Sequence, residues 1–168
     1  MDREADRVLV YSVDRDAAYG FANGVVVALA LLVALLGFLP ATATLEADLG
    51  PRLALAWRVA IPAVAFALVA GWAWWLRRCV RRIYWLPRQK AALVETYGLL
   101  RRRLAPLDPR AVTGVVEHDG TFRTTLGIEV DAPYRRIRRS DGHDLVLDDQ
   151  GRVVDAARLA AILAGRVD

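Results

Sequence analysis

Two long runs of apolar residues dominate the pattern along the chain. Residues 20–39 contain Asn23 as their only polar side chain, and residues 59–76 contain no charged side chain. A helix of about 20 residues crosses the roughly 30 Å hydrocarbon core of a bilayer. The pattern therefore predicts two transmembrane helices, at about residues 20–39 and 57–76.

The segment between the two apolar runs is too short to form a domain. Residues 40–52 can only connect the helices, so we expect an antiparallel hairpin with both chain termini on one side of the membrane. Small residues recur at every fourth position of both runs, which lets membrane helices pack closely or arises by chance in alanine-rich sequence. These rows are Gly20, Gly24 and Ala28, followed by Ala63, Ala67 and Gly71.

Aromatic and basic residues gather at both ends of the second run. Tryptophan favours the headgroup region of a membrane, and clustered arginines resist translocation. The depth and the direction of this helix are therefore predicted by its ends. We expect lipid or a partner protein to contact these residues: Trp57, Arg58, Trp72, Trp74, Trp75, Arg77, Arg78, Arg81 and Arg82.

Short β-prone runs separated by turn residues fill the rest of the chain. Residues 105–110 are predicted to form a loop because they contain two prolines, and residues 131–140 are polar and basic, with no strand assigned. Asp155 is expected to cap a final amphipathic helix, residues 156–164. Asp119-Gly120 gives the strongest hairpin signal, between two of the runs. The expected strands are residues 8–11, 83–86, 91–97, 112–118, 121–130, 145–147 and 152–154.

These elements predict a membrane α+β protein. The fold class is a two-helix transmembrane hairpin followed by a small antiparallel β-sheet domain with a C-terminal helix. We divide the chain into an N-terminal arm with a short strand (residues 1–19), the hairpin (20–76) and a basic, β-rich domain (77–168). The arm could pair with the later domain through its strand.

Charge is distributed unevenly along the 168 residues, whose net charge is +4. From Arg77 onward there are 18 basic and 12 acidic residues, so the positive excess follows the second run. The positive-inside rule then places both termini in the mitochondrial matrix or in a bacterial cytoplasm. Arginine runs at 77–82, 101–103 and 135–139 suit anionic lipid, an acidic partner protein or ribosomal RNA. Because aromatic residues are scarce near the later runs, we rank nucleic acid below protein and lipid.

Few residues offer catalytic or metal chemistry. His118 and His143 lie next to turn signals, and two histidines fall short of the three or four ligands that a metal site requires. The single cysteine, Cys79, excludes an intramolecular disulfide, and we expect it to be buried rather than reactive. Nucleophile patterns and phosphate-binding loops are missing from the sequence. We therefore predict neither an enzyme nor a transporter, with no cofactor, no metal and no small-molecule substrate.

The order of these features resembles the transmembrane protein 223 family of mitochondrial inner-membrane proteins. The shared features are an apolar strand at 8–11 with Arg15 after it, a tight hairpin, the Trp57-Arg58 pair and an arginine-flanked exit. Residues 145–148 with Gly151 then precede the final helix. Residues 101–109 and 131–140 have no counterpart.

The resemblance implies a matrix-facing domain on an inner-membrane hairpin. Its expected function is that of a non-catalytic accessory subunit or assembly factor of a respiratory complex, with cytochrome c oxidase or its supercomplex foremost. The expected partners are other membrane subunits and anionic lipid such as cardiolipin. The alternatives are a bacterial inner-membrane protein with a lipid-binding sheet domain and a membrane tether for ribosomes.

Overall fold

The computed structural model describes residues 7–36, 51–120, 122–123, 129–130 and 132–166. The chain divides into two compact units. The β unit comprises Met1–Asp14 and Trp75–Asp168, and the helical unit comprises Arg15–Trp74. The helical unit is thus inserted into the β unit after its first strand.

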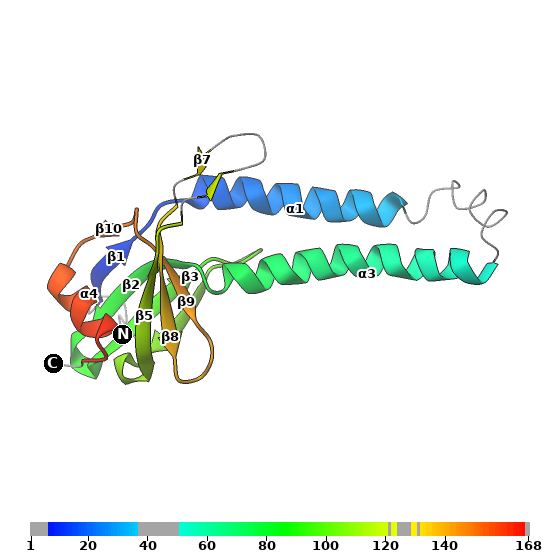
Figure 1. The fold of residues 1–168 in the computed structure, drawn as a ribbon. Coiled ribbons are helices and arrows are strands. Elements are labelled where there is room, and N and C mark those ends of the chain that lie inside the picture. Colours follow the sequence, from blue (N-terminus) through cyan, green and yellow to red (C-terminus); the bar gives the residue numbers. More distant parts are fainter. Residues whose placement is uncertain (1–6, 37–50, 121, 124–128, 131, 167–168) are drawn as a thin grey trace, which may run out of the picture. The chain divides into compact units, whose positions relative to one another are not determined.

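The β unit contains a five-stranded antiparallel sheet in the order β10-β1-β2-β3-β4 (Figure 1). The predicted pairing of residues 8–11 with the later domain is confirmed, because β1 pairs with β2 and with β10. A 3₁₀ turn, η1 (Pro87–Gln89), joins β2 to β3 as predicted. The strands are β1 (Val8–Ser12), β2 (Val80–Leu86), β3 (Ala91–Thr96), β4 (Arg103–Leu107) and β10 (Arg152–Val153).

Strand β4 overturns the prediction of a loop at residues 105–110. It lies at the edge of the sheet and pairs with β3, with Pro106 opposite Leu93. Proline lacks an N–H group, and an edge strand tolerates it because one side of the strand needs no partner. Only the second part of the predicted loop is a turn, the 3₁₀ helix η2 (Pro109–Ala111).

A second, three-stranded sheet has the order β5-β8-β9. Its strands are β5 (Val112–His118), β8 (Tyr134–Arg139) and β9 (Leu145–Asp148). Strand β8 is central to this sheet, although no strand was predicted for residues 131–140. Its only fully buried side chain is Ile137, so its basic neighbours concealed the strand pattern.

The predicted hairpin at Asp119-Gly120 is wrong. Strand β5 pairs with β8, whereas the short strands β6 (Phe122–Arg123) and β7 (Glu129–Val130) pair with each other. Gly120 does adopt a positive φ of 66°, and a Cβ there would overlap the Ala132 carbonyl. Gly120 therefore lies at the start of the segment that connects β5 to β8 and contains the β6–β7 pair. Similarly, β10 pairs with β1 and not with β9, the strand that precedes it in the sequence.

Helix α4 (Ala156–Leu163) closes the β unit as predicted. The Asp155 carboxylate accepts a hydrogen bond from the Arg158 backbone N–H at 2.8 Å, which confirms the predicted cap. Leu159 and Ile162 are buried on one face of the helix. They belong to a core that also contains Val10, Ile83, Trp85, Val94, Leu107, Ile137 and Leu147.

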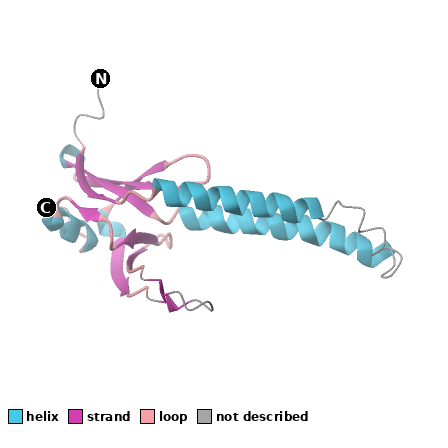
Figure 2. Cartoon of the chain, turned by 90° about the horizontal axis from the view of Figure 1, so that it is seen from above, coloured by secondary structure: helices cyan, strands magenta, loops and turns pink. Residues whose placement is uncertain are grey.

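The helical unit consists of α1 (Asp16–Leu36) and α3 (Pro51–Leu76), which lie side by side and antiparallel (Figures 1 and 2). Both are long and apolar enough to cross a membrane, over Asp16–Leu36 and Leu55–Leu76, with mean hydropathies of 2.2 and 1.9. The predicted pair of apolar helices is confirmed. Both helices begin earlier than predicted, and residues 37–39 of the first predicted span lie outside the described residues.

The two helices meet through a different face from the predicted rows of small residues. Ala30 and Ala65 are buried, whereas Gly24 and Gly71 are exposed with nothing within 4 Å of an added Cβ. The Asn23 side-chain oxygen accepts a hydrogen bond from Trp72 Nε1 at 2.7 Å. Polar groups in an apolar medium require partners. The hydrogen bond between Asn23 and Trp72 therefore favours the arrangement in which Asn23, and not the neighbouring Gly24, faces α3.

Candidate functional site

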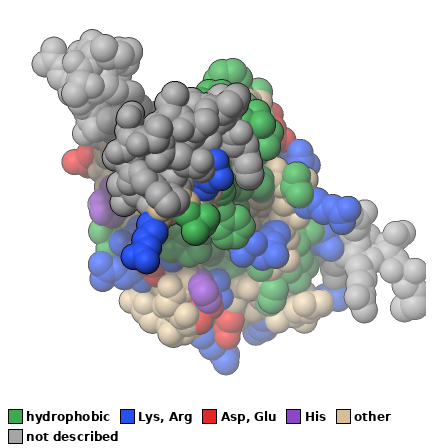
Figure 3. All heavy atoms as spheres, turned by 90° about the vertical axis from the view of Figure 1, so that its right-hand side faces the viewer, with side chains coloured by type: hydrophobic (Ala, Val, Ile, Leu, Met, Phe, Trp, Pro, Cys, Tyr) green, Lys and Arg blue, Asp and Glu red, His purple; other side chains and the backbone are tan. Residues whose placement is uncertain are grey.

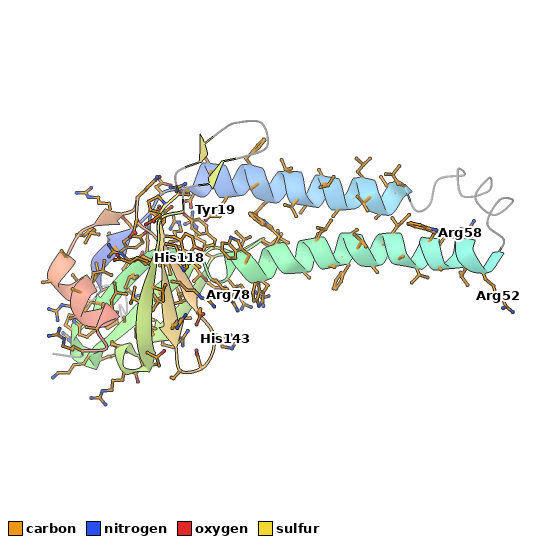
Figure 4. The ribbon with its side chains drawn as sticks, in the orientation of Figure 1. Tyr19, Arg52, Arg58, Arg78, His118 and His143 are labelled. Atoms are coloured by element: carbon orange, nitrogen blue, oxygen red, sulfur yellow. The ribbon has the colours of Figure 1, made fainter. Side chains whose placement is uncertain are left out.

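Four of the nine predicted contact residues lie in the helical unit. Trp57, Arg58 and Trp74 have exposed side chains, and Figure 4 labels Arg58 on α3. Trp72 is half-buried, and its ring nitrogen donates a hydrogen bond to the Asn23 side chain. Trp72 therefore holds the two helices together, and the side chains of the other three lie on the exposed surface.

The remaining five follow at the end of α3 and at the start of β2. Trp75 and Arg77 are exposed, whereas the Arg78 carbonyl accepts the Val146 N–H at 2.7 Å. Arg82 donates to the Tyr84 hydroxyl at 3.3 Å. The four predicted arginines thus have different environments and do not form one uniform cluster.

Arg81 is the arginine whose position differs most from the prediction. It is only 3% exposed, and its Nη1 lies 2.9 Å from Glu95 Oε1. The pairing of β2 with β3 shifts by one residue between Val80 and Arg82. Such a β-bulge re-aims a side chain, and here both Val80 and Arg81 are buried. Arg81 is therefore inaccessible to a partner, and its role is structural.

Glu95 is the centre of a small buried network. Its Oε1 atom bonds Arg81 and lies 3.9 Å from Arg102 Nε, and its Oε2 atom accepts from the Tyr84 hydroxyl at 3.3 Å. One carboxylate thereby ties together β2, β3 and the segment before β4. A buried carboxylate needs a charged partner, and Arg81 supplies it, so Glu95 has a structural role.

The arginines of β8 are paired with acidic side chains of the same unit. Three of the four basic residues in 135–139 have such partners, and on the face shown in Figure 3 acidic side chains lie next to basic ones. The hydrogen bond from Arg136 holds the pKa of Asp144 below its usual value. This internal neutralisation weakens the polyanion interpretation of the run. The pairs are Arg135 with Glu117 and Asp149 (3.2 and 2.9 Å), Arg136 with Asp144 (2.6 Å) and Arg139 with Asp141 (2.7 Å).

The arginines at 101–103 have a different environment. All three side chains are exposed, and they follow Leu100, which is 92% exposed. Sequence reasoning noted the arginines but missed Leu100. The signal that could have found it is an apolar pair, residues 99–100, placed between a glycine and three arginines outside any strand.

The two histidines and the cysteine have structural environments. His118, on β5, stacks on Tyr134 with ring centroids 4.7 Å apart, and His143 lies exposed between β8 and β9 (Figure 4). Cys79 is buried as predicted, and its Sγ lies 3.6 Å from the Trp75 carbonyl oxygen. Within the described residues, His, Cys, Asp and Glu side chains do not gather in a group of three that could hold a metal ion.

Two elements of the family resemblance meet in the β unit. The Tyr11 hydroxyl donates to the Asp148 carbonyl at 2.7 Å, and a Cβ at Gly151 would overlap the tyrosine ring. Burial, and then the nearby Asp148 charge, raise the pKa of Tyr11. The first strand and the acidic–glycine turn are therefore one packing arrangement and not a reactive site.

A groove of about 430 Å³ lies between α4 and the neighbouring strands. Its polar groups are Glu117 and Arg135, which pair with each other. The groove thus offers mainly apolar contact area. Its apolar lining residues are Val115, Val153, Ala156, Leu159, Ala160, Leu163 and Ala164.

No family model matches this chain, and no curated protein matches it either. The resemblance to the transmembrane protein 223 family therefore stays a prediction.

Proposed function

We propose that the chain is a non-catalytic accessory subunit or assembly factor of a larger membrane complex, anchored by α1 and α3. The observation that carries this proposal is the exposed apolar surface of the two helices. Only 6% and 11% of the two candidate spans is buried within the chain, and Phe21 and Phe66 are 77% and 76% exposed. Contiguous apolar surface of this extent requires lipid or other subunits to cover it.

The sheet topology supports a hairpin with both ends on one side of the membrane. Strand β1 leads into α1, strand β2 follows α3, and the two strands pair directly. A chain that entered and left on opposite sides could not form this pair. The positive excess after α3 favours the cytoplasmic or matrix side for the whole β unit.

A docking function accounts for the chemistry of the chain better than transport does. Two packed helices enclose no pore, and the polar side chains Asn23 and Trp72 satisfy each other across their interface. Several charged groups of the β unit are committed to ion pairs within it. The exposed Trp57 and Arg58 at the head of the second span are the contact residues that we assign to a partner.

The identity of the complex is a finer part of the proposal, and it rests on the family resemblance alone. That resemblance favours the mitochondrial inner membrane, with both termini in the matrix, and cytochrome c oxidase or its supercomplex as the assembly. In a bacterium, the corresponding location is the inner membrane with cytoplasmic termini.

Native-gel electrophoresis of mildly solubilised membranes, followed by mass spectrometry, tests this function. We expect the 18.6 kDa chain to migrate with a much larger complex. Arg58→Gln should weaken the association, whereas Arg52→Gln, which removes a charge from the first part of the same helix (Figure 4), should not. Migration of the wild-type chain only as a free monomer would contradict the proposal.

A further inference from the structure

The turn between β3 and β4 presents an apolar tip beside three basic side chains. Leu100 is 92% exposed, and Arg101, Arg102 and Arg103 follow it with exposed side chains. Leu104, next along the chain, is 53% exposed. We refer to residues 99–104 as the leucine–arginine turn. An exposed leucine alone is ordinary on a protein surface, but its combination with a basic cluster is characteristic of surfaces that bind membranes.

The leucine–arginine turn is held in place by its neighbours. A Cβ at Gly98 would overlap the Arg101 carbonyl, so the chain reverses tightly at this glycine. Arg102 Nε lies 3.9 Å from the buried Glu95 carboxylate. The turn therefore presents Leu100 from a fixed base, which lowers the entropic cost of binding.

Strand register places the turn at the end of the sheet where the chain leaves α3. The Tyr97 N–H donates to the Cys79 carbonyl at 3.1 Å, and Thr96 lies opposite Val80. Helix α3 ends at Leu76, only three residues before Cys79. A segment of that length spans about 10 Å at roughly 3.3 Å per residue. If α3 ends at a membrane surface, the start of the turn is therefore within reach of that surface.

We propose that the leucine–arginine turn binds an anionic bilayer surface, with Leu100 inserted below the headgroups, Arg101 and Arg103 on lipid phosphates, and Arg102 holding the turn through Glu95. This inference rests on the proposed membrane anchorage of α3. Guanidinium groups bind phosphate oxygens in a bidentate way, and a short apolar insertion plus a basic patch supplies the two signals that stable surface binding requires. The turn would fix the orientation of the β unit on the membrane.

The opposite end of the same strand pair provides a matched control. Leu86 lies opposite Ala91, and η1 (Pro87–Gln89) joins them with exposed side chains. The β2–β3 ladder between Val80 and Leu86 is about 20 Å long at roughly 3.3 Å per residue. A label at Gln89 is thus far along the sheet from the label at Leu100.

The test uses the full chain in lipid nanodiscs with an environment-sensitive fluorophore on a single cysteine. In a Cys79→Ala background, Leu100→Cys, Gln89→Cys and Phe66→Cys are labelled separately. The lipid is phosphatidylcholine with or without phosphatidylglycerol, and it contains phospholipids that are spin-labelled near the headgroup or at mid-chain. In the anionic nanodiscs, we expect a blue-shifted emission and headgroup-level quenching for the Leu100 label, mid-chain quenching for Phe66 and neither for Gln89.

Each outcome supports or overturns the inference. Quenching at Phe66 without quenching at Leu100 would overturn the lipid role of the turn and leave the membrane anchorage standing. Quenching at neither position would overturn both. Equal quenching at Leu100 with and without phosphatidylglycerol would overturn the assignment to anionic lipid.

A second measurement needs no change at Cys79. Native mass spectrometry of the chain released from the anionic nanodiscs should show fewer retained phosphatidylglycerol molecules after Arg101→Gln and Arg103→Gln are combined, a pair that leaves the contact between Arg102 and Glu95 in place. The matched control combines Arg136→Gln and Arg139→Gln, whose arginines are already paired with acids. Equal losses in both double variants would contradict the proposal.

Discussion

The buried ion pair between Arg81 and Glu95 gives the sharpest prediction of stability. Their side chains are 4% and 9% exposed, and the pair joins β2 to β3. Removing one member of a buried pair leaves the other charge in a poorly solvated site, which typically costs about 3–5 kcal/mol. We expect Glu95→Leu to lower the free energy of unfolding by about this amount, because Arg81 is the more buried partner.

The reverse substitution should cost less. After Arg81→Met, the Glu95 carboxylate still has Arg102 nearby and the Tyr84 hydroxyl as a donor. We therefore expect a loss of about 1–3 kcal/mol. The double variant should lose less free energy of unfolding than the sum of the two single losses, because it leaves no buried charge without a partner.

Denaturant titration of the detergent-solubilised chain, followed by the tryptophan signal of the β unit, measures these differences. The pair of Arg136 and Asp144 provides the control, because Arg136 is 45% exposed and a pair that is open to water contributes only about 0–1 kcal/mol. Equal, small effects of Glu95→Leu and Asp144→Asn would refute the reasoning that burial decides the magnitude.

Three further predictions concern other contacts. Asn23→Leu should weaken the helix pair by about 0.6–1.7 kcal/mol through loss of the bond to Trp72, whereas the exposed Gly24→Leu should not, as measured by disulfide trapping between the helices. Tyr11→Phe should cost about 1 kcal/mol at neutral pH. The pKa of Tyr11 is higher in the folded chain than in the unfolded chain. The stability that the Tyr11 hydroxyl contributes is therefore complete below the unfolded pKa near 10 and is lost as the pH rises above it. The melting temperatures of the wild type and Tyr11→Phe should converge at alkaline pH. The pKa of Asp144 is lowered in the folded chain, so its carboxylate contributes stability at pH values above its unfolded pKa. That stability is lost as the pH falls through the folded pKa. We therefore expect the stability of Asp144→Asn to fall less steeply with acidification than that of the wild type.

The sequence predicts those parts of the fold that follow from local patterns. Two apolar runs predicted α1 and α3, and Asp155 marked the start of α4, because span length and helix capping depend on neighbouring residues alone. Burial of Cys79 also followed from its position. Strand pairing was harder to predict from the sequence. Strand β10 pairs with β1 from the other end of the chain, and the Asp119-Gly120 turn leads into the separate β6–β7 pair.

The errors at the candidate site have specific physical causes. A bulge in β2 buries Arg81, and neither the position nor the direction of a bulge is visible in one strand alone. The basic strand β8 is stabilised by acids that lie on other elements, such as Glu117 and Asp149. The hydrogen bond from Trp72 to Asn23 selects the face through which the helices meet, and a pattern of glycines does not reveal that face.

The central claim is that other subunits of a membrane complex cover the outer faces of α1 and α3. A photocrosslinking amino acid placed at Phe66, and separately at Phe21, tests this in native membranes, because both side chains face away from the helix pair. The same group at the exposed Gln89, in the β unit, reports nonspecific capture. We predict a discrete protein adduct from at least one of the two phenylalanine positions and none from Gln89. Adducts with lipid only, at both phenylalanine positions, would contradict the account.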